Sequence, residues 1–169
     1  LKGEILQQAG RWTESEQFYS SLIHNDNLHW VKLGLARCLI QRERFSEAQS
    51  LLQPLLNRAD LKLAALDLLA EMHLRQHLYK KAQSELLQAA DMAPRNLMRQ
   101  QKLLNLSRLT HDYEQQFKAA KDLVRFARFS VYEQPDLYLN LARASIDYAL
   151  SVDEAEQTNR LSKVANESL

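Results

Sequence analysis

The stretch "LAALDLLAEMHLRQHLYKKAQSELLQAADMAPRN" (63–96) decides the fold, because it contains one complete helical hairpin. Apolar residues recur at helical spacing on both sides of a short turn at His77-Leu78. Small Ala70 and Ala82 stand where two antiparallel helices would cross closely. Tyr79 begins the second helix, where its ring can fill the gap beside the turn. The stretch therefore predicts two packed antiparallel helices.

The same hairpin recurs along the chain, because turn aromatics repeat at steps of 33, 34 and 34 residues: Trp12, Phe45, Tyr79 and Tyr113. Three residues after each stand Ser15, Ala48, Ala82 and Gln116, and nine before each stand Gly3, Ala36, Ala70 and Leu104. One hairpin cannot bury its own apolar face, so neighbouring hairpins stack. We predict an all-α, right-handed α-solenoid, with looser or shifted packing in the fourth unit because Leu104 and Gln116 are large.

Composition supports helices and excludes some classes of protein. The chain of 169 residues has only three glycines and three prolines, and 46% of it is apolar. Its net charge of +1 does not favour nucleic acid or a membrane as partner. The single cysteine, Cys38, cannot form an internal disulfide, and no apolar run is long enough to span a membrane. No signal peptide opens the chain, so we expect a cytoplasmic protein, and the start at Leu1 suggests a fragment.

The third hairpin resembles the tetratricopeptide repeat family at seven positions: Leu69, Ala70, Tyr79, Ala82, Leu86, Ala89 and Pro94. The resemblance covers residues 1–128 as four hairpins, the first truncated at its N-terminus. Residues 129–169 would add a fifth, divergent helix pair or C-terminal capping helices, beginning near Pro135. The tail after residue 150 could be a pairing helix or a frayed end. The total would be roughly nine or ten helices.

Four segments also resemble the tetratricopeptide output region of bacterial response regulators: "KGEILQQAGRW" (2–12), "LGLARCLI" (33–40), "MAPRNLMRQQKL" (92–103) and "FSVYEQPDLYLNLARA" (129–144). This resemblance implies a phospho-accepting receiver domain before the repeats in two-component signalling. It also implies a non-catalytic scaffold that binds another protein.

No pattern of residues indicates catalysis, a cofactor or a metal ion. His73 and His77 stand four apart, but no third ligand stands in a recognisable motif. His77 and His111 occupy the helix-ending position of Gly10, where a positive φ is expected, so we predict a structural role. Cys38 has no histidine or acid arranged with it and is expected to be packed. Phosphate loops and nucleophile motifs are missing from the sequence.

The inner face of the first helices is the candidate binding groove. In the register set by the turns, its side chains are Trp30, Arg37 and Gln41, then Asp67, Glu71 and Arg75, then Gln101, Asn105 and Arg108, with Arg143 and Asp147 following. This polar, mixed-sign surface suits an extended or helical peptide. A plain solvated inner face is the alternative. The clamp that other tetratricopeptide domains use for C-terminal carboxylates is rejected, because Leu33 and Arg37 replace its Lys and Asn.

Charge is unevenly distributed near the C-terminus. Residues 95–128 carry eight bases and three acids, whereas 129–169 carry three bases and seven acids. Lys118, Lys121, Arg125 and Arg128 form one helical stripe, which we call the basic stripe. It is a solvated face, a match for the acidic end, or a docking surface for an acidic protein. Nucleic acid is disfavoured because no aromatic interleaves the stripe, whereas pairing of the two charged segments between copies would give self-assembly.

The stretch "LHWVKLGLARCLIQRERF" (28–45) contains W-x-x-L-G, the usual opening of a tetratricopeptide repeat. Taken literally, it leaves Ala48 two positions late. Counting back from Phe45 instead places Leu35 and Ala36 at the helix crossing. In this register Arg37 faces the groove beside Trp30.

Overall fold

The computed structural model describes residues 2–23 and 28–167, with side chains for all of these except 154–155 and 157–167. The chain divides into two compact units, Leu1–Met92 and Ala93–Leu169, and each is considered by itself. Every regular element in the described residues is a helix, which confirms the predicted all-α fold. No helix in this part of the chain is both long and apolar enough to cross a membrane.

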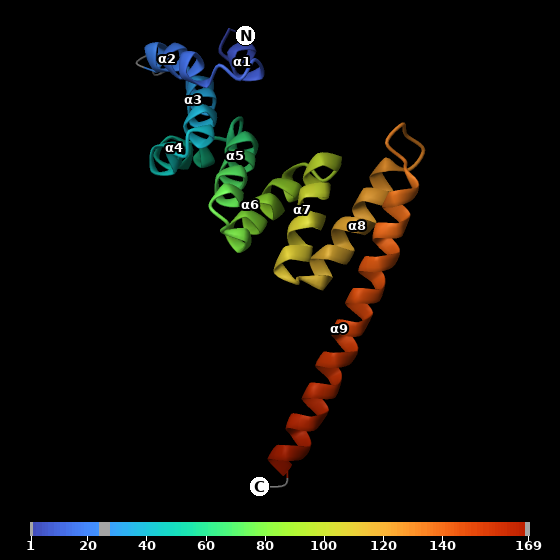
Figure 1. Ribbon diagram of the computed structural model, residues 1–169. Helices are drawn as coiled ribbons and strands as arrows, with labels where there is room; N and C mark the ends of the chain where they lie inside the picture. Colours follow the sequence, from blue (N-terminus) through green and yellow to red (C-terminus); the bar gives the residue numbers. More distant parts are fainter. Residues whose placement is uncertain (1, 24–27, 168–169) are drawn as a thin grey trace. The chain divides into compact units, whose positions relative to one another are not determined.

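The first unit consists of consecutive antiparallel helix pairs (Figure 1). Its helices are α1 (Lys2–Gln8), α2 (Trp12–Leu22), α3 (His29–Gln41), α4 (Phe45–Leu52), the 3₁₀ segment η1 (Gln53–Asn57), α5 (Lys62–Arg75) and α6 (Tyr79–Met92). Helix α3 packs on α2 before it and on α5 after it, so neighbouring hairpins share one apolar core. This is the stacking that the repeat period predicts.

The second unit contains α7 (Leu97–Thr110), α8 (Tyr113–Ala127) and α9 (Pro135–Glu167), packed in chain order. Asn96 and Asp112 cap the first two of these helices by accepting hydrogen bonds from the backbone N–H of Arg99 and Gln115. In both units, each second helix of a hairpin begins at the aromatic residue that the repeat predicts: Trp12, Phe45, Tyr79 and Tyr113.

The turns between paired helices use a left-handed residue. Gly10 has φ 72°, His77 58° and His111 54°, which confirms the predicted helix-ending role of both histidines. Glu43 takes the same position in the second hairpin with φ 60°. The backbone geometry of this position is thus retained even where a residue poorly suited to it stands there.

The crossing positions are filled as the register counted from Phe45 predicts. Ala36 and Ala48 are fully buried, and Leu35 is buried beside them. Gly34, the glycine of W-x-x-L-G, has a separate role that this register does not reveal. A Cβ on Gly34 would lie 2.3 Å from Cζ of Tyr19, so only glycine lets the tyrosine ring approach this closely.

The fourth hairpin is not loosened at its large residues. Leu104 is fully buried and Gln116 is 2% exposed. The Gln116 amide donates to Oδ2 of Asp147 at 2.9 Å, so its polar group is satisfied by α9.

The C-terminal segment forms one helix where the sequence left open a helix pair or a frayed end. Helix α9 runs from Pro135 to Glu167 and extends well beyond the end of α8 (Figure 1). The physical reason is local: no glycine or proline stands between residues 136 and 167 to break it.

Candidate protein-binding surface

Three of the predicted groove residues form a hydrogen-bonded network between α3 and α5. The Gln41 amide donates to Oε1 of Glu71 at 3.1 Å, and Nη2 of Arg75 donates to Oε1 of Gln41 at 2.7 Å. Nε of Arg75 lies 3.8 Å from the same Glu71 oxygen. The network ties these side chains of α3 and α5 together, and Asp67 lies half-buried one turn before Glu71.

Trp30 and Arg37 are both exposed on α3. They stand seven residues apart, two turns of α3, and therefore project in the same direction. Trp30 is 47% exposed and packs edge-on against Tyr19, with ring centroids 6.3 Å apart. Arg37 is exposed. An aromatic surface and a cationic group are thus presented together to solvent.

Tyr19 packs beneath the Trp30 ring, and the repeat pattern did not single this tyrosine out. Its ring lies between Gly3 of α1 and Gly34 of α3, and the residue is 2% exposed. Burial raises the pKa of Tyr19 and nearby Glu4 adds to the increase, whereas Arg37 lowers it. The tyrosine thus stays neutral and fixes the position of Trp30. The glycines 31 residues apart were a signal that could have revealed it.

The remaining groove candidates lie in the second unit. Gln101 donates to Asn105 at 3.2 Å, and Arg108 donates to Asn140 at 2.8 Å. Arg143 is exposed on α9. Asp147 accepts a hydrogen bond from the Gln116 amide of α8 and is half-buried.

The basic stripe is exposed at all four positions: Lys118, Lys121 and Arg125 lie on α8, and Arg128 directly follows its end. The statement that no aromatic interleaves it is wrong. Cζ of Arg125 lies 5.3 Å from the ring centroid of Phe126, and Cζ of Arg128 lies 4.7 Å from that of Phe129. Each ring directly follows its arginine in the sequence and therefore lies outside the 3–4 residue spacing of the stripe.

A hollow of about 470 Å³ adjoins the N-terminal half of the stripe. Its walls include Lys118, Lys121 and the stacked rings of Phe117 and Tyr148, whose centroids are 5.6 Å apart. Asp112 and Glu114 also line it, so its charge is mixed.

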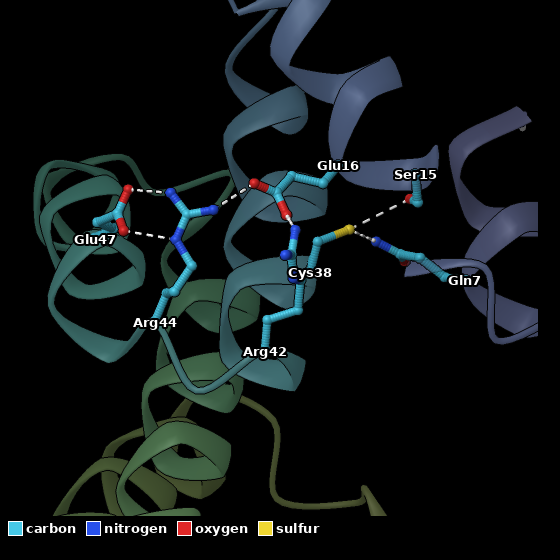
Figure 2. Close-up of polar contacts among 7 residues, drawn as sticks. All are labelled: Gln7, Ser15, Glu16, Cys38, Arg42, Arg44 and Glu47. Carbon is cyan, nitrogen blue, oxygen red and sulfur yellow. Dashed lines mark hydrogen bonds and ion pairs between the residues drawn. The ribbon is translucent and has the colours of Figure 1, made fainter. Parts of the chain in front are cut away.

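An ion-pair network joins the outer helices of the first two hairpins. Figure 2 shows Arg44 between two carboxylates, Glu16 at 2.5 Å and Glu47 at 2.5 Å. Arg42 also pairs with Glu16 at 2.5 Å. A matching pair, Arg11 with Glu14, stands 33 residues earlier, and this repeated Arg-aromatic-x-Glu spacing was a signal in the sequence. Hydrogen bonding to Arg44 lowers the pKa of Glu47.

Cys38 belongs to a buried polar cluster, as Figure 2 shows. Its sulfur accepts from the Gln7 amide at 3.2 Å and donates to Oγ of Ser15 at 3.3 Å. The cysteine is fully buried, which confirms its predicted packing role.

The two histidines of α5 and its turn contact different residues. Nδ1 of His73 lies 2.7 Å from Oε2 of Glu85 on α6, and His77 lies 3.0 Å from the hydroxyl of Tyr79. They do not converge on one point. Burial raises the pKa of Glu85, and the hydrogen bond from His73 partly offsets this increase.

The repeated hairpins and the small residues at their crossings define a helical-repeat protein of the α-solenoid class. Residues 6–71 match the family model described as tetratricopeptide repeat.

Solved structures of MamA share the fold. The one described as "MamA AMB-1 P212121" has a TM-score of 0.67 at 15% identity, over 96% of this chain and 88% of MamA. A second, "Crystal structure of MamA", has a TM-score of 0.64 at 12% identity, over 94% and 96% of the two chains. No curated protein sequence matches the chain.

Proposed function

We propose that this chain is a non-catalytic scaffold that binds a protein or peptide on the inner face formed by α3 and α5. The observation that carries the proposal is the exposed pair Trp30 and Arg37 beside the Gln41–Glu71–Arg75 network. Tryptophan and arginine are both enriched among the residues that contribute most of the binding energy at protein interfaces. The tetratricopeptide match over 6–71 supports the same class of function.

The contacts of each arginine decide which residues to substitute in a binding test. Arg75 is held by Gln41 and Glu71, so replacing it would disturb the protein's own contacts. Arg37→Ala and Trp30→Ala instead remove exposed groups. Partners cross-linked to the wild-type protein in cells should be lost with both variants. Arg58→Ala is the matched control, because Arg58 is an exposed arginine that pairs only locally with Asp60. Equal cross-linking by all four proteins would contradict the proposal.

We further propose, from the sequence resemblance, that the module is the output region of a bacterial response regulator and acts in the cytoplasm. The complete gene product should then contain a receiver domain with a phosphorylatable aspartate. Treating it with acetyl phosphate should change its capture of the partner, whereas a full-length protein without a receiver domain would contradict this context.

A second candidate function, nucleic-acid binding at the basic stripe, is favoured by the phenylalanines beside Arg125 and Arg128. Rings and cations together are the usual elements of a single-strand binding surface. If all four cations contact phosphates, log affinity should fall against log salt with a slope of about −3. Fluorescence anisotropy with a labelled oligonucleotide measures this, and no binding at low salt would dismiss the candidate. Self-assembly, through pairing of the two charged segments between copies, is the remaining alternative.

A further inference from the structure

Helix α9 presents an unpartnered face opposite the one that packs on α8. On the packed side Ala144 is fully buried and Tyr148 stacks on Phe117. On the opposite side Leu139, Ile146 and Leu150 are 62%, 59% and 57% exposed. Three large aliphatic side chains on one exposed helix face are unusual for a solvated surface.

The exposed face has the spacing of a coiled coil. Leu139, Arg143, Ile146, Leu150 and Asp153 follow one another at steps of 4, 3, 4 and 3, and all five are exposed. We call these five residues the α9 seam. This alternation places them at successive a and d positions of a heptad, with Arg143 and Leu150 as a and the other three as d.

We propose that the α9 seam pairs with the seam of a second copy of this chain, antiparallel. Antiparallel helices stack a positions on d positions of the partner, in an isologous two-fold interface. Residue 148 is the midpoint of 143 and 153 and also of 146 and 150. One two-fold axis at that level therefore opposes Ile146 to the second copy's Leu150, and Arg143 to the second copy's Asp153.

The charges of the seam favour a second copy of this chain as the partner, and antiparallel pairing as its orientation. The antiparallel pair has two central aliphatic layers flanked by two Arg–Asp layers of opposite charge. A parallel pair stacks a on a and d on d, which would oppose arginine to arginine and aspartate to aspartate. The seam is thus complementary to itself in only one orientation, and the ion pairs specify it.

The α9 seam gives a specific surface to the self-assembly alternative proposed above. It lies in the second unit, whereas Trp30 and Arg37 lie in the first. Its test is therefore independent of the test of the inner face. Variants of the α9 seam should leave cross-linking at α3 unchanged if the proposed scaffold function holds, and their effect on association can be measured without knowing any other partner.

Sedimentation velocity of the full chain over a range of concentrations tests the pairing. The wild type should form dimers, and Ile146→Glu should weaken them by about tenfold or more, because a carboxylate enters an apolar layer. Val152→Glu is the matched control: Val152 is 39% exposed on the same helix but outside the seam, so its dimers should persist. A wild-type monomer at every concentration, or equal effects of the two variants, would overturn the proposal.

Charge reversal tests the orientation. Arg143→Asp alone and Asp153→Arg alone should each weaken the dimer, because each creates two like-charge layers. The double variant R143D/D153R should restore it, because the opposite charges again face each other. A double variant as weak as the single ones would overturn antiparallel pairing. Circular dichroism confirms that each variant remains folded.

Discussion

Tyr19 and the two glycines around it show how one residue can set the separation of three helices. A Cβ at Gly3 would lie 2.4 Å from Cζ of Tyr19, and one at Gly34 would lie 2.3 Å from it. The Tyr19 ring in turn packs against the exposed Trp30. A change at Gly34 therefore alters both stability and the candidate binding surface.

Gly34→Ala should lower the free energy of unfolding by about 1–3 kcal/mol, because the added methyl group overpacks the Tyr19 ring. Urea denaturation measures the loss. In a Tyr19→Leu background the shorter side chain leaves room for the methyl group, so Gly34→Ala should cost much less there. An equal cost in both backgrounds would refute the packing explanation.

Glu43 and Gly10 occupy the same left-handed turn position, which glycine adopts without strain and glutamate does not. Glu43→Gly should raise the unfolding free energy by about 1 kcal/mol by relieving left-handed strain. Gly10→Ala should lower it, and since nothing lies within 4 Å of a Cβ at Gly10, the loss reports backbone strain alone. Thermal unfolding of both variants checks the pair. Two shifts of the same sign would contradict the prediction.

Contacts between elements account for the residues that do not fit the repeat pattern. Gln116 stands where a small residue is usual and is accommodated by its hydrogen bond to Asp147 of α9. His73 and Glu85 form a largely buried pair between α5 and α6. Both contacts tie adjacent helices together and make their packing sensitive to the state of a polar group.

The Glu85 pair should make stability depend on pH. Burial raises the pKa of Glu85 above its ordinary value of 4.5, so the folded state binds its proton more tightly than the unfolded chain does. This contribution is fully present below pH 4.5 and is lost as the pH rises through the folded-state pKa. The unfolding free energy of the wild type minus that of Glu85→Gln should fall over this range. Chemical denaturation at several pH values measures this difference in unfolding free energy. A difference that rises with pH would contradict the prediction.

At the scale of the whole molecule the described chain has two units, each with buried residues of its own. The core of the first unit includes Tyr19, Leu39 and Leu52 and continues into α5 through Leu68 and Met72. We therefore expect a fragment of residues 1–92 to be helical and to unfold cooperatively by circular dichroism. A fragment of residues 1–61, which lacks α5, should lose the cooperative transition. Similar behaviour of both fragments would contradict the assignment of this core.

The sequence by itself determined the hairpin period, the first residue of each second helix, the left-handed turns and the buried alanines at the crossings. These features depend on backbone conformation and side-chain volume, which a residue and its near neighbours set. Only the tertiary structure decided the Tyr19 site, the pairing of Gln41 with Glu71 and of Gln116 with Asp147, and the single long α9. The first three join residues 15 to 31 positions apart, whose partners are chosen by helix packing. The long α9 is a different case: the lack of glycine and proline between residues 136 and 167 was visible in the sequence, but the repeat pattern favoured a turn there.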